Sequence, residues 1–117
     1  MDNLAETVST ILEEWESVKT QLDKLFRERD QKKAKEWMDK GIALFIQFLY
    51  YTNEEFSTPA NPVPFHQFDS KPVNIEERLG FIIARPALYH SYRQLSELMV
   101  EQEKLYAKRK IVKKTSR

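Results

Sequence analysis

The stretch VNIEERLGFIIARPALYHSYRQLSELMVEQEKLY, residues 73–106, decides how this chain folds. It begins with Asn74, a residue that caps helices, and Glu77 stands three residues later, where it can complete a capping box. Arg85-Pro86 interrupts the helix, because a residue before proline avoids the helical region and proline suits a first turn. The stretch therefore predicts a short helix followed by a long one that starts at Pro86.

The residues after Pro86 form a second apolar stripe at helical spacing, which predicts a buried helix face. Gln102 is its one polar member. The apolar members are Leu88, Tyr92, Leu95, Leu98, Met99, Leu105 and Tyr106.

The N-terminal segment carries a heptad pattern whose steps alternate between four and three residues. Asp2 or Asn3 can cap this helix, with Glu6 in the first turn. The pattern fits either a homodimeric coiled coil or one helix of an antiparallel bundle, and Trp15 favours the bundle because its bulk suits a mixed core. The heptad residues are Leu4, Val8, Ile11, Trp15, Val18, Leu22 and Leu25.

A turn at residues 27–35, with Asp30 as the N-cap, should lead into a second helix that ends near Tyr51. Residues 41–51 are apolar nearly all round, which is typical of a central helix. Gly41 lies within this second helix, and a glycine there predicts that another helix packs close to its backbone. Residues 53–72 then hold four of the five prolines, and their aromatic residues predict a loop that folds back over the bundle.

These patterns predict an all-α fold. It is a three- to four-helix bundle with a long Pro-rich loop between the second and third helices and a Pro-kinked C-terminal helix pair. We expect one domain over residues 1–110 and a basic tail over residues 111–117 that is disordered, with extension of the last helix as the alternative.

Composition narrows the function classes. The sequence is 41% hydrophobic and 32% charged and has no cysteine, which excludes disulfides and cysteine-based zinc sites. It shows neither a secretory signal pattern at its N-terminus nor an apolar run of about twenty residues, so a cytoplasmic protein is expected.

Few residues offer catalytic chemistry, so we expect no enzyme, no metal site and no cofactor. Glycine-rich phosphate loops are excluded because only two glycines are present. The remaining enzymatic or small-molecule alternative needs a pocket that brings His66 and Asp69 together with His90.

The strongest candidate site is a partner or anion contact at the helix junction, formed by Arg85, Tyr89, His90 and Arg93. If Pro86 starts a helix, its free amide groups lie beside Arg85 and favour an anion. The structural alternative is that the arginines pair with carboxylates while the tyrosines cover the core. This site predicts a non-enzymatic protein–protein interaction module, with the Pro-rich loop covering the junction.

The C-terminus supports a second function. The last ten residues, KRKIVKKTSR, carry six bases and no acid, although the formal net charge of the whole chain is only +1. Such a segment can contact phosphates without reading sequence, which makes a nucleic-acid-associated accessory protein the alternative. Its bases are Lys108, Arg109, Lys110, Lys113, Lys114 and Arg117.

Within the opening stretch, residues 73–98 resemble the YpoC-like family, small helical proteins of Gram-positive bacteria. The resemblance implies a cytoplasmic bacterial protein with an all-helical domain, and it brings no catalytic residue or ligand to this sequence. It rests on Asn74, Glu77, Arg78, Leu79, Phe81, Ile82, Pro86, Tyr89, Tyr92, Gln94, Leu95 and Leu98.

Overall fold

The computed structural model describes residues 3–115 and contains four α-helices and no strand within that range. This confirms the predicted all-α class. The elements are α1 (Asn3–Arg27), α2 (Gln31–Thr52), the 3-10 turn η1 (Phe65–Gln67), α3 (Ile75–Ala84) and α4 (Tyr89–Thr115).

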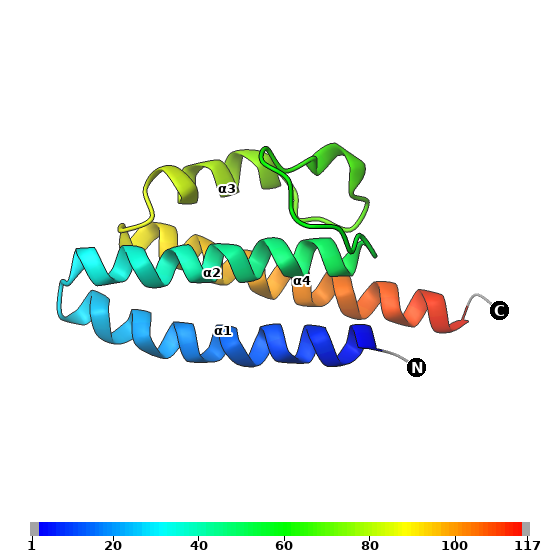
Figure 1. Ribbon diagram of the computed structural model, residues 1–117, viewed down its shortest axis with the longest axis horizontal. Coiled ribbons are helices and arrows are strands. Elements are labelled where there is room, and N and C mark those ends of the chain that lie inside the picture. The colour runs from blue at the N-terminus through cyan, green and yellow to red at the C-terminus, as the bar shows by residue number, and fades with distance from the viewer. Residues whose placement is uncertain (1–2, 116–117) are drawn as a thin grey trace.

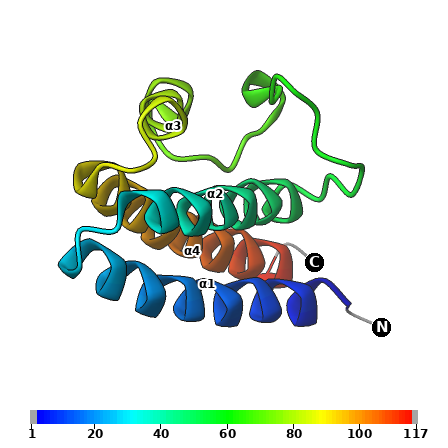
Figure 2. The same ribbon diagram turned by 60° about the vertical axis from the view of Figure 1, so that its left-hand side comes forward.

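Helices α1, α2 and α4 run side by side along the long axis of the molecule, which extends 51 Å. Helix α3 lies on the side of α2 that faces away from α1 (Figures 1 and 2). The turn between α1 and α2 and the junction between α3 and α4 lie at one end of the bundle. Residues 53–72 lie toward the other end (Figure 1).

The heptad residues of α1 form its contact with the rest of the chain. Six of them, from Val8 to Leu25, are no more than 5% exposed, and Leu4 packs partly against the same core. Of the two alternatives, the structure supports the helix of a bundle, because this apolar stripe faces the core of its own chain.

Gly41 lets α2 approach both neighbouring helices. A Cβ atom at this position would lie 2.9 Å from Cζ3 of Trp15 in α1 and 3.0 Å from Cδ2 of Leu95 in α4. Both distances are shorter than the usual carbon–carbon contact of about 3.5–4.0 Å. The packing role predicted for this glycine is confirmed.

The two predicted N-caps differ in the structure. The Asp30 side chain accepts a hydrogen bond of 3.1 Å from the backbone N–H of Lys33, so its capping role is confirmed. Asn74 precedes α3 but adopts a left-handed conformation with φ 57°, and its side chain makes no capping hydrogen bond. N-cap residues usually have extended dihedrals that aim the side chain at the first turn. The capping role predicted for Asn74 is therefore wrong.

Helix α4 begins at Tyr89, three residues later than the predicted start at Pro86. Residues 85–88 form a turn in which the Leu88 N–H donates to the Arg85 carbonyl at 3.3 Å. Proline suits the second position of such a turn as well as it suits a helix start. As a result Leu88, predicted in the buried stripe, is 41% exposed. The stripe is buried at Tyr92, Leu95, Leu98, Met99 and Gln102.

The loop between α2 and α3 is closed at its base by Asn53 and Ser70. The Asn53 amide donates to the Ser70 carbonyl at 2.9 Å, and the Ser70 N–H donates to Asn53 Oδ1 at 2.8 Å. Phe68 is buried against Tyr50, with ring centroids 5.1 Å apart, whereas Phe56 is 62% exposed.

Candidate functional site

The four residues predicted to form a contact lie around the α3–α4 junction but face two directions. Tyr89 faces α1, where its ring centroid lies 5.6 Å from that of Phe26. Arg85 and His90 instead face α3, where both lie beside the ring of Phe81, at 5.9 and 5.6 Å. Arg93 is exposed on α4. The structure therefore brings Arg85 and His90 together and places Tyr89 apart from them.

The Pro-rich loop does not cover this junction, because the two lie toward opposite ends of the bundle (Figure 1). That expected arrangement is wrong. The expected anion contact also assumed a helix that starts at Pro86, and this predicted start is wrong. The helix starts at Tyr89, and the Arg85 carbonyl beside it accepts a hydrogen bond of 2.6 Å from the Ser91 hydroxyl.

The pocket required by the enzymatic alternative is not assembled. His66 and Asp69 do line one cavity, of about 410 Å³, where the loop meets the start of α3. His90 lies beside Phe81 instead, near the other end of α3, and it is not among the residues that line this cavity.

Tyr89 lines a hollow of about 360 Å³ together with Asp23, Phe26 and Arg27. Beneath it, Tyr92 stacks on Phe26 at 5.5 Å and its hydroxyl donates to Asp23 at 2.7 Å. Burial raises the pKa of Tyr92, and the hydrogen bond to Asp23 raises it further. This end of the bundle is therefore an ordered aromatic surface with a charged rim.

The predicted basic tail begins inside α4, which continues past residue 110 to Thr115, so the helical alternative describes this backbone. Lys108 and Lys110 are exposed. Arg109 instead donates to Ser70 Oγ at 3.2 Å and lies 3.5 Å from a Glu54 carboxylate oxygen, so it holds the loop against α4. The side chains of Lys113 and Lys114 and all of Arg117 lie outside the described part of the chain.

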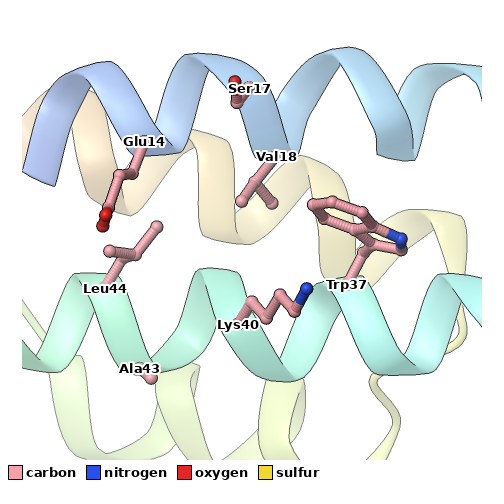
Figure 3. Close-up of a pocket in the computed structure, with 7 residues that line it drawn as sticks. All are labelled: Glu14, Ser17, Val18, Trp37, Lys40, Ala43 and Leu44. Atoms are coloured by element: carbon pink, nitrogen blue, oxygen red, sulfur yellow. The ribbon is translucent and has the colours of Figure 1, made fainter.

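The sequence analysis did not predict a groove of about 390 Å³ that runs between α1 and α2. Figure 3 shows that α1 and α2 both contribute side chains to the space between them. The groove lies on the side of the helix pair that α4 leaves open, because α4 packs where Leu95 meets Gly41. Its lining residues are Glu14, Ser17, Val18, Trp37, Lys40, Ala43 and Leu44.

The groove carries two opposite charges, with Glu14 at one end and Lys40 beside Trp37 (Figure 3). The ammonium group of Lys40 lies 4.1 Å from the centre of the half-buried Trp37 ring. Glu14 lies beside Leu44, and no described residue forms an ion pair with its carboxylate. Periodicity places Trp37 on an apolar stripe and Glu14 on a solvated face, so only the pairing of the two helices reveals the groove.

Residues 3–115 contain no cluster of three or more His, Cys, Asp or Glu side chains placed to hold a metal ion. Within the same residues, no helix combines the length and the apolar character needed to cross a membrane.

Comparison with known proteins places the chain in a family. The sequence model described as YpoC-like protein matches residues 5–114. The chain belongs to the YpoC-like family. It is 30% identical over 106 residues to Uncharacterized protein YpoC of Bacillus subtilis (strain 168). That match covers 86% of this chain and 63% of the relative, so the chain spans somewhat less than two thirds of the relative's length. No solved structure matches the chain.

The family match confirms the resemblance drawn from residues 73–98 and extends it to both α1 and α2. The groove between these helices therefore lies entirely within the region that the YpoC-like family model covers.

Proposed function

We propose that this YpoC-like chain is a non-enzymatic protein-binding module of the bacterial cytoplasm that holds a helix of another protein in the α1–α2 groove. The main observation behind this proposal is the groove, because it combines an apolar floor with the aromatic ring of Trp37 and with two opposite charges, Glu14 and Lys40. Amphipathic helices are recognised in this way by hydrophobic grooves between helices.

The dimensions favour a helix as the occupant. Packed helices lie 8–10 Å apart, with the side-chain ridges of one helix in the grooves of the other. On another side of α2, α4 packs closely where Leu95 meets Gly41, and it meets α1 through Tyr92 and Phe26. A helix from a partner would be the matching neighbour on the open side, where Val18 and Leu44 form the floor and Ala43 leaves room.

The charges specify the orientation of the partner helix. Its apolar face would pack on Trp37, a basic residue would pair with Glu14, and an acidic residue would pair with Lys40. Complementary charges of this kind contribute mainly to the rate of association and to specificity. The partner we propose is therefore an amphipathic helix with one base and one acid that flank an apolar face.

The test compares two exposed alanines on helices. Ala43→Arg places a long charged side chain in the groove, and Ala107→Arg makes the same change on the exposed face of α4. Each variant is used as bait in crosslinking and quantitative mass spectrometry from the native cell, and the captured protein is then titrated in purified form. We expect Ala43→Arg to weaken binding at least tenfold and Ala107→Arg to leave it unchanged. Equal binding by Ala43→Arg and wild type would refute the groove as the contact.

Nucleic-acid association is the second candidate, and the exposure of Lys108 and Lys110 on α4 favours it. Its affinity for duplex DNA or RNA should fall steeply with salt, since each phosphate contact releases a counterion. Replacement of Lys108, Lys110, Lys113 and Lys114 by Gln should abolish such binding. No binding at low salt would rule this candidate out.

A further inference from the structure

One end of the bundle, which we call the basic end, collects positive charge. The α1–α2 turn and the α3–α4 junction lie together there (Figure 1), and the ring centroids of Phe26 and Tyr89 are 5.6 Å apart. Residues 23–33 and 85–93 carry seven bases and three acids, whereas the rest of the chain carries twelve bases and fifteen acids. The basic end is therefore positive on a chain whose remainder is negative. Its bases are Lys24, Arg27, Arg29, Lys32, Lys33, Arg85 and Arg93.

The bases of this end are available to a partner. All seven side chains are exposed, and none forms an ion pair with another described residue. Arg109, near the opposite end of the bundle, instead lies 3.5 Å from a Glu54 carboxylate oxygen. A cluster of exposed bases of one sign attracts an anionic surface.

The basic end also exposes apolar side chains at its tip. Leu88 and Tyr89 follow one another where the turn after α3 enters α4, and they are 41% and 57% exposed. A nucleic acid could pair with the bases, but it would give the aliphatic Leu88 side chain no apolar surroundings. The surface of a lipid bilayer offers both, because anionic headgroups lie directly above the hydrocarbon of the acyl chains.

We propose that the basic end docks on the surface of an anionic lipid bilayer, with Leu88 and Tyr89 inserted among the headgroups. Tyrosine is typical of this depth, because its ring is apolar and its hydroxyl stays hydrated. The surrounding bases pair with the anionic headgroups, and each base near the surface adds to the affinity. The docking surface shares no residue with the α1–α2 groove, so it is a second contact of the molecule.

Cosedimentation with vesicles tests this proposal. The intact chain should bind vesicles of phosphatidylglycerol mixed with phosphatidylcholine and should not bind phosphatidylcholine alone, and salt should weaken the binding. Lys32→Glu/Lys33→Glu reverses two charges in the first turn of α2, where acids suit the helix dipole. Lys108→Glu/Lys110→Glu makes the same change on exposed positions of α4 toward the other end. We expect the first variant to lower the partition coefficient roughly tenfold or more and the second to leave it nearly unchanged. Equal melting temperatures would show that both variants fold.

The apolar tip has its own pair of variants. Leu88→Gln removes an aliphatic side chain from the tip, and Val100→Gln does so at a 49% exposed position of α4. Leu88→Gln should weaken vesicle binding several-fold without changing its dependence on salt, and Val100→Gln should not weaken it.

Three results would overturn the proposal. The first is equal binding to charged and uncharged vesicles, and the second is an equal loss in each variant and its control. The third is an oligonucleotide that binds through Lys32 and Lys33 while no vesicle binds at low salt, which would assign the basic end to nucleic acid instead.

Discussion

Gly41 sets the distance between the helices of the core, and its replacement by alanine should destabilise the protein. The added Cβ would lie 2.9 Å from the buried Trp15 ring and 3.0 Å from Leu95. Overpacking of this kind costs about 1–3 kcal/mol, of which the better helix propensity of alanine offsets up to about 1 kcal/mol. Urea unfolding should show a net loss of about 1–2 kcal/mol. In Gly80→Ala, the control in open space, the same change should stabilise the chain by about 0.4–1 kcal/mol; equal effects at the two glycines would contradict this account.

Tyr92 should make the protein sensitive to alkali. Burial raises the pKa of its hydroxyl above the ordinary value, and the hydrogen bond to Asp23 adds to the rise. The folded state therefore keeps this proton where the unfolded chain loses it, so the stabilisation is present below about pH 10 and is lost as the pH rises above that value. Tyr92→Phe should lower the free energy of unfolding by about 1 kcal/mol at neutral pH. It should also reduce the loss of unfolding free energy that the wild type shows above about pH 10. The measurement is urea unfolding at several pH values on both sides of pH 10, and an unchanged decline in the variant would show that another group causes it.

At the scale of elements, Arg78 joins α3 to α4 through a two-pronged ion pair with Glu101. Its Nη1 donates to Glu101 Oε1 at 2.9 Å, and Nη2 donates to the other carboxylate oxygen. The hydrogen bonds from Arg78 lower the pKa of Glu101, which opposes the effect of its partial burial. The pair therefore stabilises the fold above the ordinary glutamate pKa of about 4.3, and this contribution is lost as the pH falls through the lower folded-state value.

Glu101→Gln should reveal this contribution. The Glu101 side chain is 39% exposed, so solvent screening limits the loss to about 0.5–1 kcal/mol near neutral pH. The difference in unfolding free energy between wild type and the variant should shrink at low pH, once the pH has fallen through the lowered pKa of Glu101 and the wild-type carboxylate is protonated too. Glu103→Gln, at an exposed neighbouring position, is the control and should have little effect at either pH. A pH-independent loss in Glu101→Gln would mean that packing, not charge, joins the helices.

The spacing of apolar residues is sufficient to predict that the helices exist. It does not determine where they begin and end, because the ends depend on the backbone conformation of a few residues. The stripes of α1 and α2 each place a buried face correctly, and Asp30 caps α2 as its residue type predicts. Asn74 is an equally good cap by residue type, but its left-handed backbone directs the chain from the loop into α3 instead. Pro86 is compatible with both a helix start and a turn, and the hydrogen bond from Leu88 to Arg85 decides for the turn.

At the scale of the whole molecule, the candidate contact sites depend on which segments meet in space. The sequence alone does not determine which segments meet. Residues 85–93 were singled out because charged and aromatic side chains are dense there, yet Tyr89 faces Phe26 while His90 faces Phe81. The groove was missed because Glu14 and Trp37 are 23 positions apart in the sequence and lie on different helices. The spacing of apolar residues identifies the buried face of each helix, but it does not show which two helices leave a groove between them.

The position of the groove leads to a prediction about assembly. The groove lies between α1 and α2 (Figure 3), and α4 packs on another side of α2, where Leu95 meets Gly41, so a partner helix should bind without displacing α4. Sedimentation velocity with the purified partner should therefore show a complex that contains one partner helix per groove. Ala43→Arg should leave the two proteins as separate species, because its long charged side chain occupies the groove. A complex that this variant does not dissociate would show that the partner binds another surface.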